Sequence, residues 1–379
     1  MPPPSPFAAH RADLESLAAE NRRRTLAPCA GLDFASNDYL ALAGSYALGE
    51  ALATGLQRGL PAGSGGSRLL RGNHDEHEAL EAHAARHYGS EAALFFPTGF
   101  AANAAFFATL PQRGDLIVHD ELIHASAHDG MKLGRADRTA AAHNDAQAFE
   151  DAILRWRAAG ATGTPWIAVE SLYSMEGDCA PLADLAAVAD RHDAILVIDE
   201  AHATGVYGPA GQGLAHGLAP RENLVTLHTC GKALGCEGAL LCGPRIVRDF
   251  LINRGRPFIF STAPSPLMAW LVRQALEIVA NEPERAARLH TLVRHAEARL
   301  AKLGLAASGS QIIPIVIGDN ERTMRIASAL QADGFDVRGI RPPTVPHGTA
   351  RLRIAITLNV GEREIDAMTE SLSAAMATA

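Results

Sequence analysis

One lysine of this chain lies in a setting where an arginine could not do the same chemistry. Of the 34 Lys+Arg residues only Lys132, Lys232 and Lys302 are lysine, so arginine supplies positive charge almost everywhere. Lys232 follows an apolar run and lies among glycines in TCGKALGCEG (229–238), which permit close backbone approach. A lysine can lose its proton and attack a carbonyl group, whereas an arginine stays protonated. We therefore predict that Lys232 is a nucleophile, while Lys132 and Lys302 fit structural or solvated positions.

The segment LVIDEAHATG (196–205) ends an apolar run with two carboxylates and a histidine. The letters D-E-A-H also occur in nucleic-acid helicases. A helicase needs the phosphate loop GxxxxGK[ST], but the Gly231–Lys232 pair precedes Ala233, and Thr226 takes the first glycine position. The formal net charge of -8 gives no help in binding a polyanion. The sequence excludes a helicase, and a dinucleotide oxidoreductase fits poorly because no GxGxxG joins an early strand to a helix.

The polar residues around Lys232 match the parts that pyridoxal phosphate requires. Lys232 would bind the cofactor's carbonyl as a Schiff base, and Asp199 would pair with the pyridine nitrogen. His202 could reach the ring oxygen, and His124 could stack on the ring. Gly99–Phe100 open a helix, whose amides and positive dipole end suit a phosphate. Simpler interpretations stay open, because Asp199 could cap a helix and His124 could be a hydrogen-bonded interior histidine.

The composition is that of an ordinary globular protein of 379 residues with 47% hydrophobic residues. The five cysteines form no CxxC motif, so neither a disulfide framework nor a zinc site is indicated, and we expect no metal. The N-terminus MPPPSPFAAHRADLE lacks the apolar core of a signal peptide, and no apolar run approaches the roughly 20 residues of a membrane span. The predicted compartment is the cytoplasm.

Apolar runs alternate with helical stretches and should position these residues. The expected strands are 92–96, 115–119, 166–170, 194–199, 224–228 and 239–242, with helices such as 181–193 between them. This alternation predicts an α/β domain with a mainly parallel sheet and helices on both faces. Ligands bind beyond the carboxyl ends of such strands, where Asp, His, Ser, Thr and Lys residues follow five of them.

The pattern changes after Pro264, where a long helical stretch over roughly 267–305 is followed by strands at 312–317, at 336–340 and in RLRIAIT. This indicates a smaller C-terminal α+β domain. We predict three parts: an N-terminal helix with a connecting segment (1–40), a large cofactor-binding domain (41–280) and the small domain (281–379).

Eight segments of the sequence, taken together, are highly specific for one protein family. They are SNDYL (36–40), GSGGSRLLRGNHDEHEALE (63–81), FPTGFAAN (96–103), HASAHDG (124–130), ESLYSMEGDCAPL (170–182), DEAHATGVYGPAGQG (199–213), TCGKALG (229–235) and FSTAPSP (260–266). In these segments the chain resembles the α-oxoamine synthases, which belong to the fold type I pyridoxal phosphate transferases. The resemblance runs from about Asn37 to the C-terminus. The resemblance implies the fold type I architecture and a homodimer with shared active sites.

The resemblance also implies further site residues. Beside Lys232, Asp199, His202 and His124, the residues expected at the cofactor are Gly99, Phe100, Ser174, Thr229, Ser261 and Thr262. Ser261 and Thr262 would reach the phosphate bound in the neighbouring subunit. The residues expected at the substrate are Arg22, Asn37, His124, Arg341 and Thr344. The sequence departs from the family pattern at Glu237, where a glycine is common, and at Ser265, where a proline is frequent.

Within the family, IRPPTVPHGTARLRIAIT (340–357) and IVIGDN (315–320) are most similar to the biotin-pathway branch. That branch condenses L-alanine with a pimeloyl thioester, carried by acyl-carrier protein or coenzyme A, and releases CO₂. Two alternatives stay open: a glycine-using enzyme such as glycine C-acetyltransferase, and a non-catalytic partner subunit of the same fold.

Overall fold

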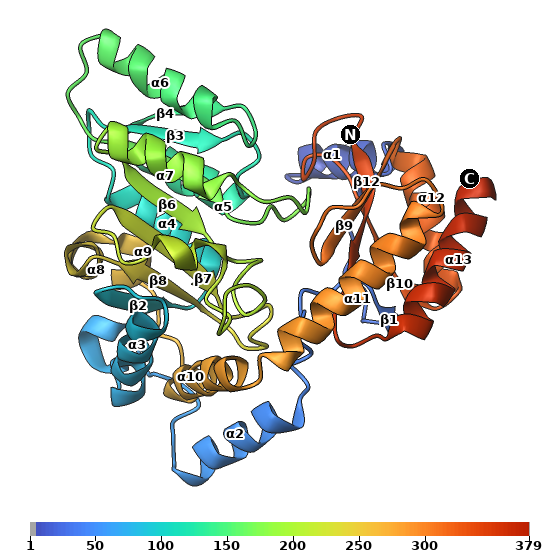
Figure 1. The fold of residues 1–379 in the computed structure, drawn as a ribbon, viewed down its shortest axis with the longest axis horizontal. Helices are drawn as coiled ribbons and strands as arrows, with labels where there is room; N and C mark the ends of the chain where they lie inside the picture. Colours follow the sequence, from blue (N-terminus) through green and yellow to red (C-terminus); the bar gives the residue numbers. More distant parts are fainter. Residues whose placement is uncertain (1–4, 379) are drawn as a thin grey trace. The chain divides into compact units, whose positions relative to one another are not determined.

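The computed structural model describes residues 5–378, which form two compact units (Figure 1). The smaller unit takes in the described parts of Met1–Ser36 and Arg288–Ala379 together with Met175–Gly177. The larger unit consists of Asn37–Ser174 and Asp178–Ala287. Among the described residues, no helix is long and apolar enough to cross a membrane.

The larger unit is built around a mixed β-sheet with the strand order β2-β8-β7-β6-β5-β3-β4. Its strands are β2 (Ala92–Phe96), β3 (Leu116–Asp120), β4 (Asp137–Ala141), β5 (Pro165–Glu170), β6 (Ile195–Asp199), β7 (Leu224–Thr229) and β8 (Ala239–Gly243). The pairs from β4 to β7 are parallel, whereas β8 runs antiparallel to both β7 and β2. The predicted mainly parallel sheet is confirmed, and β2 points the same way as the parallel strands.

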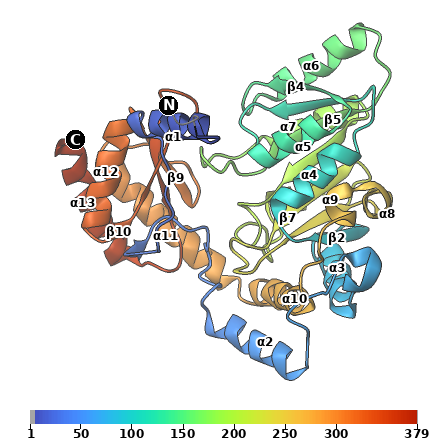
Figure 2. The same cartoon turned by 180° about the vertical axis from the view of Figure 1, so that it is seen from behind.

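Helices cover both faces of this sheet because its inner strands are apolar on both sides (Figure 2). Val197 of β6 packs in a core cluster with residues of α4 (Gly99–Thr109), α5 (Ala125–Leu133), α8 (Arg245–Arg254) and α9 (Arg256–Ile259). Leu196 and Ile198 belong to a second cluster with α6 (Ala146–Ala158) and α7 (Leu182–Arg191). Successive side chains of a strand point to opposite faces, so both faces become core.

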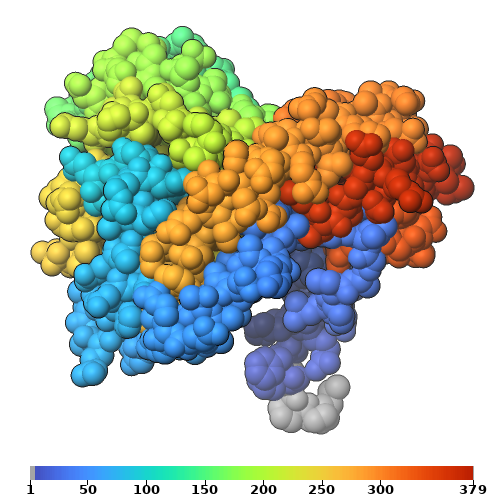
Figure 3. Space-filling model, turned by 60° about the horizontal axis from the view of Figure 1, so that its bottom comes forward, coloured from blue at the N-terminus to red at the C-terminus, as the bar shows by residue number. Residues whose placement is uncertain are grey.

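A helical layer beside β2 contains α2 (Tyr46–Gln57), α3 (Asp75–His87) and α10 (Pro266–Asn281), with the short turns η1 (Arg68–Gly72) and η2 (Leu214–Leu218) elsewhere in the unit. Figure 3 shows α2, in blue, packed along α10, in orange. The Trp270 indole N–H donates to the Ala51 carbonyl at 2.8 Å, which ties the two helices together. Glu76 on α3 accepts hydrogen bonds from Arg58 and Arg273.

The smaller unit has an antiparallel sheet in the order β11-β12-β9 and a short parallel pair, β1-β10. The strands are β1 (Leu32–Asp33), β9 (Ile312–Gly318), β10 (Phe335–Asp336), β11 (Arg338–Ile340) and β12 (Ala350–Ala355). The helices are α1 (Ala8–Ala19), α12 (Asn320–Ala332), α13 (Glu362–Thr378) and most of α11 (Glu284–Ala301). Because β1 pairs with β10, the N-terminal segment is part of this unit.

Three features differ from the sequence expectations. The long helical stretch is divided into α10 and α11, with Glu282–Pro283 between them, because a proline cannot continue a helix interior. The strand β4 was not expected, since DRTAA is a largely exposed segment without an apolar run. The N-terminal part, predicted as a helix with a connecting segment (1–40), pairs with the C-terminal unit, and the two compact units divide between Ala287 and Arg288, whereas the predicted domain boundary lies near 280. Whether the units are independent folding domains stays a prediction.

Candidate active site

The carboxyl ends of five strands meet at one edge of the large sheet. These ends are Phe96, Asp120, Glu170, Asp199 and Thr229, and β2 joins the parallel strands there because β8 reverses between β2 and β7. The structure therefore brings together polar residues from distant parts of the larger unit, as the sequence predicted.

Asp199 is a buried carboxylate held on both of its oxygens. It is 8% exposed, Asn103 Nδ2 donates to Oδ2 at 2.9 Å, and the Ala201 amide donates to Oδ1 at 3.0 Å. Asn103 also donates to Ser126 Oγ at 2.9 Å. Sequence reasoning missed Asn103, although a buried amide in the apolar helix GFAANAAFFAT was a usable signal. The asparagine and the backbone together fix the orientation of the carboxylate.

His124 is the N-cap residue of α5 and is exposed to solvent. Its Nδ1 accepts the Ser126 amide at 3.2 Å and lies 2.8 Å from Ser126 Oγ. Since Nδ1 accepts a backbone N–H, the ring proton belongs on Nε2. Surrounding protein lowers the pKa of His124 by desolvation, the charge of Lys232 lowers it further, and Asp199 opposes both. The imidazole is thus kept neutral within electrostatic reach of Lys232 and Asp199.

His202 and Asn37 are joined by a tyrosine that the sequence analysis did not assign to the site. Tyr39 is fully buried, and its hydroxyl lies 2.7 Å from His202 Nδ1 and 3.0 Å from Asn37 Oδ1. This contact holds the His202 ring through Nδ1. The neighbouring letters S-N-D-Y-L contained both Asn37 and Tyr39, but only the fold shows that they meet His202.

Lys232, Thr229 and Gly99 form the next part of the site. The Lys232 ammonium donates to Thr229 Oγ1 at 3.3 Å, and this hydroxyl donates to the Ala201 carbonyl at 3.3 Å. A Cβ at Gly99 would lie 2.7 Å from Thr229 Cγ2, so only glycine allows α4 to start this close to β7. Thr98 caps α4 through the Ala101 amide, and helix geometry leaves the Gly99 and Phe100 amides to bind an anion.

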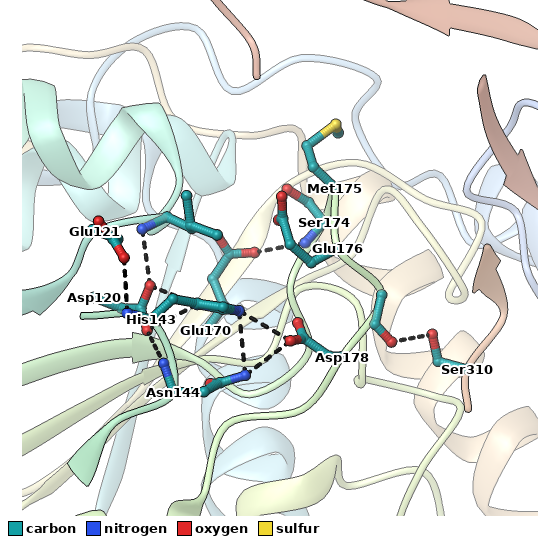
Figure 4. A network of polar contacts seen from close by, with 12 residues as sticks. Asp120, Glu121, His143, Asn144, Glu170, Ser174, Met175, Glu176, Asp178 and Ser310 are labelled. Carbon is teal, nitrogen blue, oxygen red and sulfur yellow. Dashed lines mark hydrogen bonds and ion pairs between the residues drawn. The ribbon is translucent and has the colours of Figure 1, made fainter. Parts of the chain in front are cut away.

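A cluster of charged residues lies beside the ends of β3 and β5 (Figure 4). Asp120 contacts His143 Nδ1 at 2.9 Å, and Asp178 contacts His143 Nε2 at 3.0 Å. Burial alone would lower the pKa of His143, but the hydrogen bonds and charges of the two carboxylates outweigh it and raise the pKa to about 10. Asp120 also accepts the Leu122 amide at 2.8 Å, so this cluster fixes the turn that leads to His124. The sequence analysis did not identify it.

Ser174 and Glu200 also lie at this edge. The Ser174 amide donates to Glu170 Oε2 at 3.3 Å, and the Ser174 side chain is partly buried. Glu200 is fully buried and accepts hydrogen bonds from Ser171 Oγ and from the Leu214 and Ala215 amides. Burial raises the pKa of Glu200 to about 7, although these three hydrogen bonds act to lower it. Glu200, which had no assigned role, anchors the loop that leads into η2.

The other expected residues lie in two places. Arg22, Arg341 and Thr344 are together in the smaller unit: Arg22 Nε donates to the Pro342 carbonyl at 3.2 Å, Arg341 donates to the Asn21 carbonyl, and Thr344 Oγ1 accepts from Arg24. Burial lowers the pKa of Arg341 from its ordinary value. Ser261, partly exposed, and Thr262, exposed, lie in the larger unit between α9 and α10.

Comparisons with known proteins show the family of the chain. The sequence pattern of the family "Aminotransferase class I and II" matches residues 30–372. An 8-amino-7-oxononanoate synthase from Anaeromyxobacter dehalogenans is 41% identical over 381 residues, which cover 96% of this chain and 94% of the relative. The crystal structure of 8-amino-7-oxononanoate synthase from Francisella tularensis has a TM-score of 0.77 at 27% identity, over 91% of this chain and 97% of that one.

A structure of SPT with a PLP internal aldimine is similar in fold, with a TM-score of 0.89 over 99% of this chain and 98% of that one, at 24% identity. The predicted fold type I architecture is therefore confirmed. The donor set described above is chemically suited to the same kind of cofactor. Asp199 is a fixed anion, the start of α4 is a cradle that a Cβ would fill, and Lys232 is an amine within hydrogen-bond distance of Thr229. Within residues 5–378, no group of three or more His, Cys, Asp or Glu side chains is arranged to hold a metal ion.

Proposed function

Because the chain belongs to the family of 8-amino-7-oxononanoate synthases, within the class I and II aminotransferases, we propose that it condenses L-alanine with a pimeloyl thioester. The products are 8-amino-7-oxononanoate, CO₂ and the free carrier thiol, and the place of the reaction is biotin biosynthesis. The observation that carries the proposal is the hydrogen-bonded set Asp199–Asn103–Ser126–His124 beside Lys232 on a chain 41% identical to such a synthase.

Pyridoxal phosphate, when bound, supplies a ring that accepts the electrons left on the amino-acid α-carbon. We propose that Lys232 holds it covalently, that Asp199 keeps its pyridine nitrogen protonated, and that His202 binds its ring oxygen. Gly99 and Phe100 offer their amides to the phosphate, and Ser174 and Thr229 complete the polar surroundings. The Asn103 and Ala201 donors keep Asp199 in place for this contact.

The protein's own groups would move the substrate protons. Once it is no longer bound to the cofactor, Lys232 Nζ would take the α-proton of L-alanine, because a free amine in this position can alternate between its two protonation states. His124, held neutral with its proton on Nε2, would stack on the cofactor ring and could donate a hydrogen bond to the acyl group. Arg341 holds a substrate carboxylate through its planar fork, and Arg22, Asn37 and Thr344 complete the substrate contacts.

We further propose a homodimer in which Ser261 and Thr262 of one subunit reach the phosphate bound in the other. Both residues precede α10, and Ser261 is partly exposed and Thr262 exposed, so that a neighbouring subunit could reach them. Analytical ultracentrifugation tests the dimer. Mixing Lys232→Arg subunits with Thr262→Ala subunits tests the shared site. If the site is shared, the mixture should have an activity that differs from the average of the two separate variants. The cytoplasm stays the predicted compartment.

A substrate panel tests the reaction itself. Alanine, glycine and serine are each combined with pimeloyl, acetyl and succinyl thioesters, on coenzyme A and on acyl-carrier protein, while CO₂ and free thiol are measured. The proposal predicts the highest kcat/KM for alanine with a pimeloyl thioester. Glycine with acetyl-coenzyme A as the best pair would reassign the chain to the glycine-using alternative, and no turnover with any pair would favour a non-catalytic subunit.

A further inference from the structure

A cavity in the larger unit lies away from the candidate active site. It has a volume of about 260 Å³, and its buried wall includes Tyr88, Ala215, Thr226, His228 and Cys242. Thr226 and His228 are alternate residues of β7, whereas Val225 and Leu227, between them, pack in the cluster with α4. The cavity is therefore on the face of β7 opposite to α4, which carries Asn103 and the phosphate cradle.

The wall of this cavity contains a buried hydroxyl with no protein partner. Tyr88 is 6% exposed, and among residues 5–378 its hydroxyl has no hydrogen-bond partner. Its ring stacks on His228 with centroids 3.5 Å apart and planes 14° apart, so the side chain is fixed. Burial raises the pKa of Tyr88 well above its usual range, which keeps the phenol protonated as a donor. Leaving such a group without a partner costs about 1–3 kcal/mol, which a bound acceptor would recover.

The other polar groups in the buried part of the wall are neutral and already paired. His228 Nδ1 lies 2.9 Å from Thr204 Oγ1, and this hydroxyl donates to the Glu200 carbonyl, so Nδ1 carries the imidazole proton. His228 Nε2 in turn accepts from Thr226 Oγ1 at 2.9 Å. Burial lowers the pKa of His228 well below its ordinary value and raises that of the Cys242 thiol, so neither is charged. The buried part of the wall therefore offers no counter-ion for a charged ligand. The charged residues of the lining are Glu91 and Glu222, which are exposed, and Arg221, which is partly exposed and paired with Asp190.

Hydrogen bonds fix the loop that lines the cavity. The Ala215 amide is bound by the buried Glu200 carboxylate, and the Asn223 side chain donates to the Ala194 carbonyl at 2.9 Å, which fixes the loop from η2 to β7. A preformed cavity spares a ligand the cost of ordering its walls. A cavity of about 150 Å³ is enough for benzene in another protein, so this volume admits a larger ring.

We propose that this cavity is a second binding site, for a small uncharged ring compound whose hydrogen-bond acceptor is bound by the Tyr88 hydroxyl. The apolar and aromatic wall receives the ring. The site is separate from the proposed reaction and does not depend on it.

Binding of 4-fluorophenol and fluorobenzene to the cofactor-loaded enzyme, followed by fluorine NMR, tests the proposal. The two probes differ by the oxygen that Tyr88 would bind. We expect 4-fluorophenol to bind roughly five- to tenfold more tightly than fluorobenzene, as one neutral hydrogen bond predicts. Tyr88→Phe should bring the two affinities together. Tyr46→Phe, which removes a hydroxyl bound to Glu50 on a side chain that is 80% exposed, is the matched control and should keep the wild-type ratio.

An unchanged affinity ratio in Tyr88→Phe, or no binding of either probe, would overturn the proposal. Lys232→Arg enzyme should bind both probes like the wild type, and loss of binding there would place the rings in the active site instead. If Tyr88→Phe does not fold, crystals of the wild type soaked in 4-fluorophenol decide the question. Ring density with its oxygen on the Tyr88 hydroxyl supports the site, and an ordered water alone on that hydroxyl contradicts it.

Discussion

Two histidines near the same edge of the large sheet have opposite electrostatic surroundings. His124 is bound at Nδ1 by the amide and hydroxyl of Ser126, and its pKa is lowered by desolvation and by Lys232. His143 lies between Asp120 and Asp178, which raise its pKa to about 10. The first ring is neutral and exposed, as the proposed proton transfer and stacking require. The second is a cation that joins three loops.

The comparison teaches that a histidine beside carboxylates is not by itself a catalytic group. What separates the two is which nitrogen is occupied and by what: a donor leaves His124 neutral with one nitrogen for a ligand, whereas two acceptors occupy both nitrogens of His143. We expect changes on the His124 side to affect turnover and changes on the His143 side to affect stability.

The largest effect is expected from Lys232→Arg. Arginine keeps the charge but cannot serve as nucleophile or base, so kcat/KM should fall by at least about 10³–10⁴-fold, together with the visible absorbance of the bound cofactor. Stopped thiol-release assays and absorbance spectra measure both. Lys132→Arg is the control, since Lys132 pairs with Asp129 on the surface, and it should behave like the wild type. Full turnover of Lys232→Arg would show that the reaction does not use Lys232, and would contradict the catalytic role proposed for the surroundings of His124.

The sharpest test of the comparison replaces each of the two histidines in turn. His124→Asn should lower kcat by about 10²–10³-fold with little change in the free energy of unfolding, because the side chain is exposed. His143→Gln should lower kcat by less than tenfold but destabilise the protein by about 3 kcal/mol, because two carboxylates lose their shared cation. Turnover and urea unfolding of both variants measure the effects. Equal losses of activity in the two variants would show that both histidines serve the reaction.

The stability contribution of His143 should depend on pH. A histidine with an ordinary pKa near 6.5 in the unfolded chain and about 10 in the folded protein stabilises fully below about pH 6.5. This contribution is lost as the pH rises through 10, since the proton then leaves the folded protein too. The difference in unfolding free energy between wild type and His143→Gln should therefore shrink between pH 7 and 10. If the difference in unfolding free energy stays constant over this range, the raised pKa of His143 is contradicted. His295→Gln, which removes a histidine from a surface ion pair with Asp366, is the control.

The sequence predicted the residues that end buried strands better than the residues that hold them. Asp199 follows a continuous apolar run, and such runs are the clearest signal in a chain of this fold class. Asn103 lies 96 residues before Asp199 and meets it only because α4 packs against the sheet. His143 follows β4, an exposed strand whose polar letters carry no periodic signal. A local pattern can mark such a residue, as the amide in the apolar helix α4 does, but it does not show which distant residue the side chain meets.

The smallest effect is expected from Ser126→Ala, and it tests the origin of the difference between the two histidines. The variant removes the hydroxyl that links Asn103 to His124 Nδ1 but keeps the backbone donor, so the neutral form of His124 loses part of its support. The pKa of His124 should rise toward its ordinary value, and kcat near neutral pH should fall roughly two- to tenfold. The acidic limb of the pH–rate profile should move to higher pH, because a larger part of the enzyme then carries a protonated, unreactive imidazole. Ser126→Thr retains the hydroxyl and should restore the wild-type profile. If the limb does not move in Ser126→Ala, desolvation and Lys232 alone keep His124 neutral, and the serine serves only to position the ring.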